Sequence, residues 1–274
     1  LVTIVLQSGA FSNVINLFSG SESRFPLEFG KNILVVLENE ENLKNLSESE
    51  FYTRNTKATS LSVLTREDLF DNNLESTDDT FKAILKDQEF EMHFKNKIST
   101  KDIESFVSDS SIGTIFYSVE EGMSKSKIKS LINISNKSNT PVLFSKSTYP
   151  YKTIGILINN DFGETSSNSV AFDLAASLSA SLTAVNVSQP KFLQSEESSK
   201  VSDSIEKLQD LALSHEILLD LENKEGNEAK IFSEMSNKFD LSVISTGTNQ
   251  SWQSRKTVEF IAINSKSSVL YIPS

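Results

Sequence analysis

The feature that most constrains this chain is a pattern of short apolar runs and amphipathic segments that occurs twice, about 120 residues apart. The segments from Lys31 to Leu37 (KNILVVL) and from Lys152 to Ile158 (KTIGILI) are continuous apolar runs, each followed by a polar turn and a helical period. Such runs are typical of strands that are buried on both faces of a parallel sheet. The length of 274 residues leaves room for two domains, so we predict a duplication of a whole domain.

The second half shows the alternation most clearly. Val170, Leu174 and Leu178 recur at helical spacing, with Ala171 and Ala175 beside them. After this helix the sequence predicts further strands at 182–185, 216–219, 241–244 and 269–272. Between these strands the sequence predicts a long helix that includes Val201 to Ala212, a shorter helix around Ile231, and a last helix that includes Val258 to Ala262.

The first half repeats this order with longer loops. Strands are predicted at 61–64, 90–94, 113–117 and 141–144, and helices are marked by Phe81 with Ile84 and Leu85, by Ile103 with Phe106, and by Ile128 with Leu131 and Ile132. The fold class is therefore α/β, with two tandem doubly wound five-stranded parallel sheets and helices on both faces. We expect an N-terminal lead at 1–30, a first domain at 31–148 and a second at 149–274, with the boundary in the segment that holds Pro150.

Composition argues against several classes of function. The net charge of −11 disfavours nucleic acid as a partner, and the chain has no cysteine. Its two histidines, His93 and His215, lie far apart, so we expect no metal site, and their surroundings suggest structural roles. No apolar segment surrounds the adjacent acidic residues at 40–41, 78–79 and 196–197, so we expect them to lie on the solvated surface. No nucleophile elbow is present either, so we expect no catalytic residues and no enzyme activity.

The N-terminal segment is unusual for an acidic protein, because Leu1 to Leu17 contains no charged residue. One interpretation is a helix packed on the first domain. The other is the remnant of a preceding membrane segment, with Ser21 to Gly30 as a tether. The chain begins without Met, which favours a fragment of a longer protein, although no run in it approaches the roughly 20 apolar residues of a membrane span.

The order of elements and the closing strands, TPVLFS from Thr140 and SSVLYIPS from Ser267, resemble the universal stress protein family. That resemblance implies a doubly wound five-stranded domain, often in tandem, and many members of the family bind ATP. The run KNILVVLENEENLKNL from Lys31 resembles, more narrowly, the cytoplasmic domains that follow the membrane part of monovalent cation/proton antiporters.

Ligands of open α/β sheets bind at the carboxyl ends of strands, near the point where the strand order reverses. The loops there are 38–41 and 120–123 in the first half, and 159–164 and 247–254 in the second. The resemblance implies an acidic residue after the first strand and a G-x2-G-x9-G-[ST] loop after the fourth, whose small residues let backbone N–H groups approach phosphates. The candidate ligand-binding residues of the second half are Asn159, Asp161, Gly163, Gly247, Arg255 and Lys256.

The phosphate loop is broken in both halves. Gln250 stands where the second glycine belongs, Arg255 and Lys256 fall near the last Gly-Ser pair, and the first half offers only Glu38 and Gly122. Arg255 and Lys256 either hold an anion at a helix start or are simply solvated. The segment around Asp161 either contacts an adenine or ribose or forms an ordinary tight turn. We therefore expect ATP to bind weakly or not at all; the resemblance leaves ATP or another adenine nucleotide as the cofactor to consider.

Two readings remain. The first is a non-enzymatic regulatory or ligand-binding module, the cytosolic tail of a cation/proton antiporter in the inner membrane, with a transporter domain in the same polypeptide and dimer contacts. The alternative is a free-standing tandem universal stress protein that binds an adenine nucleotide in the cytoplasm. In both readings the closing strands at 142–144 and 269–272 are expected to meet within the chain, which would make one pseudo-dimer.

Overall fold

The computed structural model describes residues 32–39, 42–56, 58, 60–69, 83, 90–120, 122–158, 167–188, 198–246 and 252–273. The first repeat consists of β1 (Asn32–Leu37), α4 (Leu43–Asn55), β2 (Ser60–Arg66), η2 (Glu67–Leu69), β3 (Phe90–Lys95), α6 (Thr100–Asp109), β4 (Thr114–Ser118), α7 (Lys125–Ser138) and β5 (Val142–Ser145). The second consists of β6 (Thr153–Leu157), α8 (Ser167–Leu178), β7 (Ser181–Ser188), α9 (Ser198–His215), β8 (Leu219–Glu225), α10 (Glu228–Met235), η4 (Ser236–Lys238), β9 (Leu241–Ser245), α11 (Trp252–Asn264) and β10 (Ser268–Ile272).

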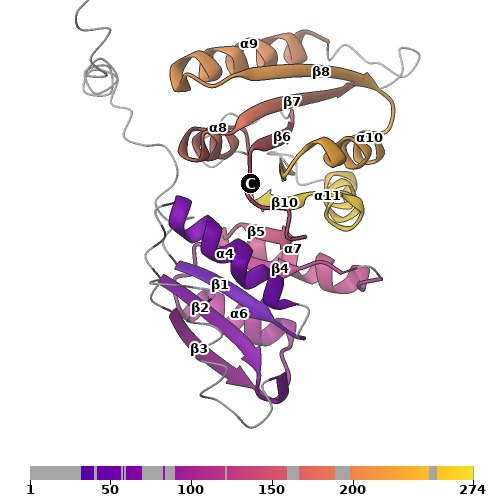
Figure 1. Ribbon diagram of the computed structural model, residues 1–274. Coiled ribbons are helices and arrows are strands. Elements are labelled where there is room, and N and C mark those ends of the chain that lie inside the picture. The colour runs from indigo at the N-terminus through magenta and orange to yellow at the C-terminus, as the bar shows by residue number, and fades with distance from the viewer. Residues whose placement is uncertain are drawn as a thin grey trace, which may run out of the picture.

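The ten described strands form one continuous sheet in the order β3-β2-β1-β4-β5-β10-β9-β6-β7-β8 (Figure 1). Neighbouring strands within each repeat are parallel, and the order in each repeat is that of a doubly wound domain. Strands β5 and β10 are antiparallel, with Val142 opposite Tyr271 and Phe144 opposite Val269. This pairing confirms the prediction that the closing strands meet within the chain.

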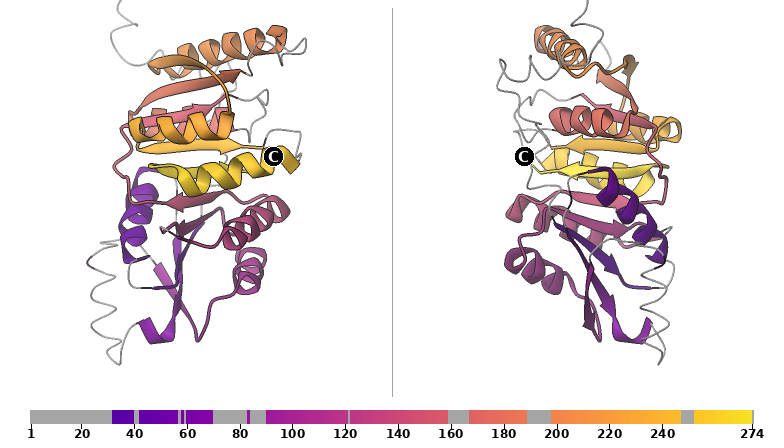
Figure 2. Two further views of the ribbon diagram at one scale, coloured as in Figure 1. Left: turned by 90° about the vertical axis from the view of Figure 1, so that its right-hand side faces the viewer. Right: turned by 60° about the vertical axis from the view of Figure 1, so that its left-hand side comes forward.

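Burial on both faces explains why the strands are apolar throughout. In β1, Ile33, Val35 and Leu37 face a cluster that includes α4, α8 and α9, while Leu34 and Val36 face a cluster that includes α6, α7, α10 and α11. Figure 2 shows these two helical layers on opposite sides of the sheet. Each cluster contains residues of both repeats, so the two cores are continuous across the junction.

Helix ends follow local chemistry. Helix α6 begins with a capping box, in which Ser99 and Asp102 each bond the backbone N–H of the other. Helix α7 ends at Asn139 in the left-handed region, with φ of 53°. The sharp boundaries of these helices are thus encoded in short polar sequences.

One strand prediction is wrong. The apolar segment at 216–219 was expected to be a strand, but β8 begins at Leu219 and continues to Glu225, in register with β7. Glu216 takes a left-handed conformation after α9, with φ of 55°, and Leu218 is 84% exposed. The strand at this edge of the sheet is largely charged, so it lacks the apolar run that marks the buried strands. The helix predicted around Phe81, Ile84 and Leu85 lies outside the described residues.

A buried carboxylate connects the repeats. Glu48 of α4 is fully buried and accepts hydrogen bonds from the hydroxyls of Tyr151 and Ser268, both at 2.6 Å. It also accepts from the Ser145 hydroxyl and from the Ser147 N–H, the latter at 3.2 Å. Four donors from β5, the inter-repeat segment and β10 therefore converge on one side chain of the first repeat.

Candidate functional site

The first repeat changes strand order between β1 and β4, so its candidate site lies at the carboxyl ends of these two strands. Six described side chains meet there, from the turn after β1, from the N-cap of α4, from β4, from the segment that leads into α7 and from α7 itself. These residues, which we call the first-repeat network, are Glu38, Asn39, Asn42, Tyr117, Glu120 and Lys127.

An ion pair lies at the centre of this network. The Glu38 Oε1 accepts a hydrogen bond from the Lys127 Nζ at 2.6 Å, and its Oε2 accepts one from the Tyr117 hydroxyl. The two charged side chains are only 26% and 20% exposed, and the Lys127 Nζ lies 5.5 Å from the centroid of the Tyr117 ring. Burial, followed by the bond to the Glu38 carboxylate, raises the pKa of Tyr117, which stays a neutral donor.

Asn42 organises the turn after β1. Its Oδ1 accepts from the backbone N–H groups of Glu38 and Asn39 at 2.9 and 3.2 Å. Its Nδ2 donates to the Glu120 Oε1 at 2.6 Å, and the Asn39 Nδ2 donates to the same oxygen at 2.8 Å. The described backbone amides of this turn are therefore already bonded to side chains.

Arg66, at the end of β2, closes another side of the same turn. Its Nη1 donates to the backbone oxygen of Glu38 at 3.2 Å, and its guanidinium also pairs with Asp68. The nearby cations, Lys127 and Arg66, thus both have carboxylate partners. Glu38 and Glu120 add negative charge, which opposes a polyphosphate, and the described N–H groups of the turn, those of Glu38, Asn39 and Asn42, are already bonded to side chains.

The second-repeat candidates divide into two groups. Asn159, Asp161, Gly163 and Gly247 lie outside the described residues. Arg255 and Lys256 lie in α11, and both are exposed. The Lys256 Nζ is 3.2 Å from the Glu259 Oε2 within the same helix. The structure therefore places two of the six candidates on one exposed helix start.

The described part of the second site includes a contribution from the first repeat. The Tyr271 hydroxyl, from β10, donates to the Asn136 Oδ1 of α7 at 2.7 Å. Thr246, directly after β9, lies 3.4 Å from the same hydroxyl, and the Ser167 hydroxyl at the start of α8 lies 3.2 Å from that of Ser245. Burial raises the pKa of Tyr271. The carboxyl ends of β9 and β10 thus form a polar corner that the two repeats share.

The sequence pointed to the loops of Glu38 and Glu120, but it missed Tyr117 and Lys127. Tyr117 belongs to an apolar strand, and Lys127 belongs to a helix with several lysines, so nothing local in the sequence distinguishes either residue from its neighbours. A signal was present, since a tyrosine at the carboxyl end of a buried strand brings a hydroxyl to the ligand-binding edge. Only the strand register, with Val36 opposite Tyr117, shows that this hydroxyl lies beside the turn that holds Glu38.

The two histidines lie apart, one beside α6 and one at the end of α9. The His93 ring lies edge-on to Phe106 of α6, with centroids 4.6 Å apart. His215 ends α9, with its Nδ1 3.9 Å from an Asp173 carboxylate oxygen. Within the described ranges, no three His, Cys, Asp or Glu side chains are grouped so that they could hold a metal ion. None of the described helices is long and apolar enough to cross a membrane.

Solved structures share this arrangement of both repeats. A universal stress protein from Archaeoglobus fulgidus aligns with a TM-score of 0.64 and 13% identity, covering 90% of this chain and 98% of that one. A putative universal stress protein from Pseudomonas aeruginosa aligns with a TM-score of 0.63 and 16% identity, covering 90% and 94%. The fold is that of the universal stress proteins.

A domain of a membrane transporter has a similar fold. The cytoplasmic domain of a prokaryotic cation chloride cotransporter aligns with a TM-score of 0.55 and 14% identity, covering 89% of this chain and 95% of that one. No protein-family model matches the chain, and no curated protein matches it. The likeness to universal stress proteins is therefore a likeness of fold, because the sequence identities are low.

Proposed function

We propose that this chain is a non-enzymatic regulatory module, the cytoplasmic part of a cation transporter of the cation/proton antiporter kind at the inner membrane. The observation that carries the proposal is the first-repeat network, in which polar side chains bond one another at the carboxyl ends of β1 and β4, the edge where ligands of such sheets bind. A repeat whose ligand-binding edge is closed by its own hydrogen-bonded side chains is suited to contacts with another protein domain rather than to the binding and release of ATP.

The energetics support a closed first site. Charge-assisted hydrogen bonds such as those of Glu38 with Lys127 and Tyr117 contribute about 1.5 to 3 kcal/mol each. A nucleotide that entered this site would have to displace them while bringing its phosphates beside Glu38 and Glu120. We therefore expect the first repeat to bind no nucleotide in the native chain.

The likeness to the cotransporter domain supports the transporter assignment. That domain is the cytoplasmic part of a cation chloride cotransporter, and the alignment covers 89% of this chain and 95% of the domain. The antiporter assignment rests on the sequence of residues 31–46. This segment contains β1 and the first residues of α4, and it supplies Glu38, Asn39 and Asn42 to the first-repeat network.

Ion flux in membrane vesicles tests the proposal. Vesicles from cells that make the complete native polypeptide are compared with vesicles in which residues 32–273 have been deleted from it. The proposal expects flux to persist while its dependence on pH or ion concentration shifts. Lys127→Ala should cause a similar shift, whereas Lys137→Ala, which removes another lysine of α7, should not. Unchanged regulation after the deletion, or a native polypeptide without a membrane domain, would contradict the proposal.

The alternative is a free-standing tandem universal stress protein that binds an adenine nucleotide. It is favoured by the match to the Archaeoglobus fulgidus protein, whose chain is covered almost completely. Its site would be in the second repeat, at Asn159, Asp161, Gly163, Gly247, Arg255 and Lys256. Calorimetry with ATP and AMP discriminates between the two: micromolar affinity that is lost in Asp161→Ala supports the alternative, and the absence of heat supports the regulatory module.

A further inference from the structure

Helix α7 has an unusual composition for a protein with a net charge of −11. It contains Lys125, Lys127, Lys129 and Lys137 and no acidic residue. One of the four, Lys127, turns inward to Glu38, whereas the other three are exposed. The exposed lysines lie at intervals of four and eight residues, so they fall within about 120° of the helix circumference, on its outer side.

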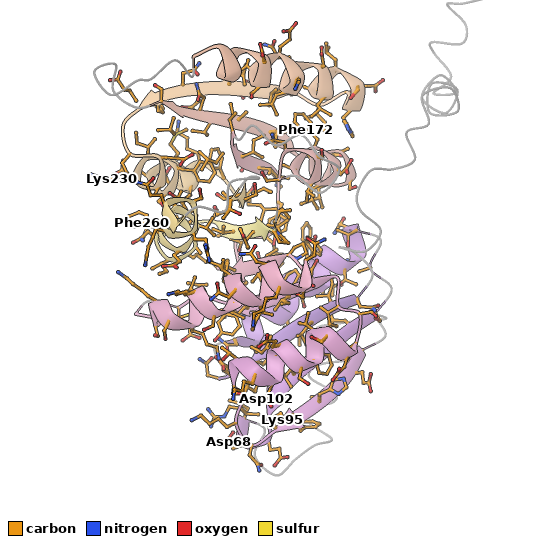
Figure 3. The ribbon with its side chains drawn as sticks, turned by 180° about the vertical axis from the view of Figure 1, so that it is seen from behind. Asp68, Lys95, Asp102, Phe172, Lys230 and Phe260 are labelled. Carbon is orange, nitrogen blue, oxygen red and sulfur yellow. The ribbon has the colours of Figure 1, made fainter. Side chains whose placement is uncertain are left out.

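Helix α11 lies beside α7 on the same side of the sheet and extends this outer side. The two helices pack against each other, and Figure 2 shows them in one layer with α6 and α10. The outer face of α11 carries Lys256 and Phe260, and Phe260 is 42% exposed. Figure 3 shows Phe260 projecting outward from this helix. We call the residues Lys125, Lys129, Lys137, Lys256 and Phe260 the α7–α11 face.

The charges of this face are only partly compensated. Lys137 pairs with Glu104 at 2.8 Å, and Lys256 pairs with Glu259 at 3.2 Å. No ion pair within the described part of the chain involves Lys125 or Lys129. The flanking helices each carry more acidic than basic residues, since α6 has Asp102, Glu104 and Asp109 beside Lys101, and α10 has Glu228 and Glu234 beside Lys230. The excess of positive charge on this layer is therefore confined to α7 and α11.

We infer that the α7–α11 face binds an anionic lipid surface. Lysine side chains interact with a diffuse negative field as point charges, whereas defined phosphate or carboxylate groups favour the planar fork of arginine. A juxtamembrane basic residue contributes about 1 kcal/mol near an anionic leaflet. The exposed Phe260 ring supplies the apolar contact that such a surface accepts at headgroup depth.

The overall negative charge does not prevent this contact. Charges are screened beyond a Debye length of about 10 Å at 0.1 M salt, so a surface that approaches α7 and α11 responds mainly to that layer. Acidic residues on α4, α9 and β8 lie in other parts of the molecule, across the sheet or at its edge (Figure 1). The binding should therefore be oriented and should weaken steeply with salt.

Vesicle sedimentation tests the inference on the chain itself. Vesicles of phosphatidylcholine, with or without about 30% phosphatidylglycerol, are compared at about 0.05 and 0.5 M salt. We expect binding only to the anionic vesicles at low salt. The charge reversal K125E/K129E should reduce the partition coefficient at least about tenfold, because it removes two attractive charges and introduces two repulsive ones.

The matched control is K44E/K207E, which changes the net charge by the same amount on α4 and α9 across the sheet. This control should retain wild-type binding. Equal losses in the two variants, or equal binding to neutral and anionic vesicles, would overturn the inference. Binding to polyglutamate without binding to vesicles would also overturn it and would point to an acidic protein partner. The inference does not rest on the transporter proposal, since vesicle binding and regulated flux can succeed or fail separately.

Discussion

Glu48 lies in α4 of the first repeat, and its fully buried carboxylate has four hydrogen-bond donors but no cationic partner among the described residues. Burying a charge is tolerated only when its hydrogen bonds are satisfied. The donors come from β5, from the segment between the repeats and from β10, so the charge is satisfied only when both repeats are in place. The side chain thereby selects one relative placement of the two repeats.

Replacement of Glu48 should be strongly destabilising. Glu48→Ala leaves four buried donors without an acceptor and should lower the free energy of unfolding by about 3 to 5 kcal/mol. Glu48→Gln keeps one acceptor oxygen and should lower it by less. Urea denaturation followed by circular dichroism measures both. The control Glu206→Ala, at an exposed position of α9, should change stability by no more than about 0.5 kcal/mol.

Lys146 gives a second prediction at this scale, because burial, aided by the nearby Lys266, lowers its pKa from 10.5 to about 8. Its Nζ donates to the backbone oxygens of Ile263, at 2.9 Å, and Ser265 at the end of α11. Between pH 8 and 10.5 the unfolded chain therefore binds more protons at this residue than the folded chain. Its contribution to stability should rise across that range, by up to about 3 kcal/mol.

The test compares the pH dependence of unfolding in wild type and Lys146→Met. The variant loses the bonds to α11 at every pH, but the rise in its free energy of unfolding above pH 8 should be smaller than in wild type. Tyr52 and Tyr151, whose buried hydroxyls have raised pKa values, contribute equally to both proteins and cancel in the difference. Lys44→Met, on the exposed side of α4, should keep the wild-type slope; a parallel slope in Lys146→Met would contradict the assignment.

At the scale of elements, β6 contains a glycine where its neighbours are large. A Cβ atom at Gly155 would overlap the ring of Phe239, which precedes β9. Gly155→Ala should therefore lower the free energy of unfolding by about 1 to 3 kcal/mol, as overpacking does. In the double variant with Phe239→Leu the two effects should partly cancel, with an interaction energy of at least about 0.5 kcal/mol. If the changes in unfolding free energy of the two single variants simply add up in the double variant, the Phe239 ring is not the reason that position 155 requires glycine.

The elements that the sequence predicted best are those whose physics is local. Strands such as β1 and β10 are buried on both faces and are apolar at almost every position, so their type is visible in a few residues. The strand β8 was misplaced because an edge strand with one solvated side has no such signature. The first-repeat network could be located only to its loops, since the meeting of Tyr117 and Lys127 with Glu38 depends on strand register across about 80 residues.

At the scale of the whole molecule, the antiparallel contact of β5 and β10 turns two repeats into one sheet. Polar contacts reinforce this junction: the Thr148 hydroxyl donates to the backbone oxygen of Asp240 at 2.6 Å, and it accepts from the Ser268 N–H at 2.8 Å. Helices α7 and α11 pack across the same junction. Each repeat thereby covers a strand edge that the other would leave open to association.

The continuous sheet predicts that the two repeats unfold together. Both hydrophobic clusters include residues of both repeats, so loss of one repeat would expose apolar surface of the other. Trp252 is the only tryptophan and belongs to α11, so its fluorescence reports on the second repeat. Hydrogen exchange of the β1 and β4 amides reports on the first. We expect the same free energy of unfolding from both probes, and a parallel decrease in both for Glu48→Ala. A first repeat that opens at lower free energy than the Trp252 transition would instead show two independent domains.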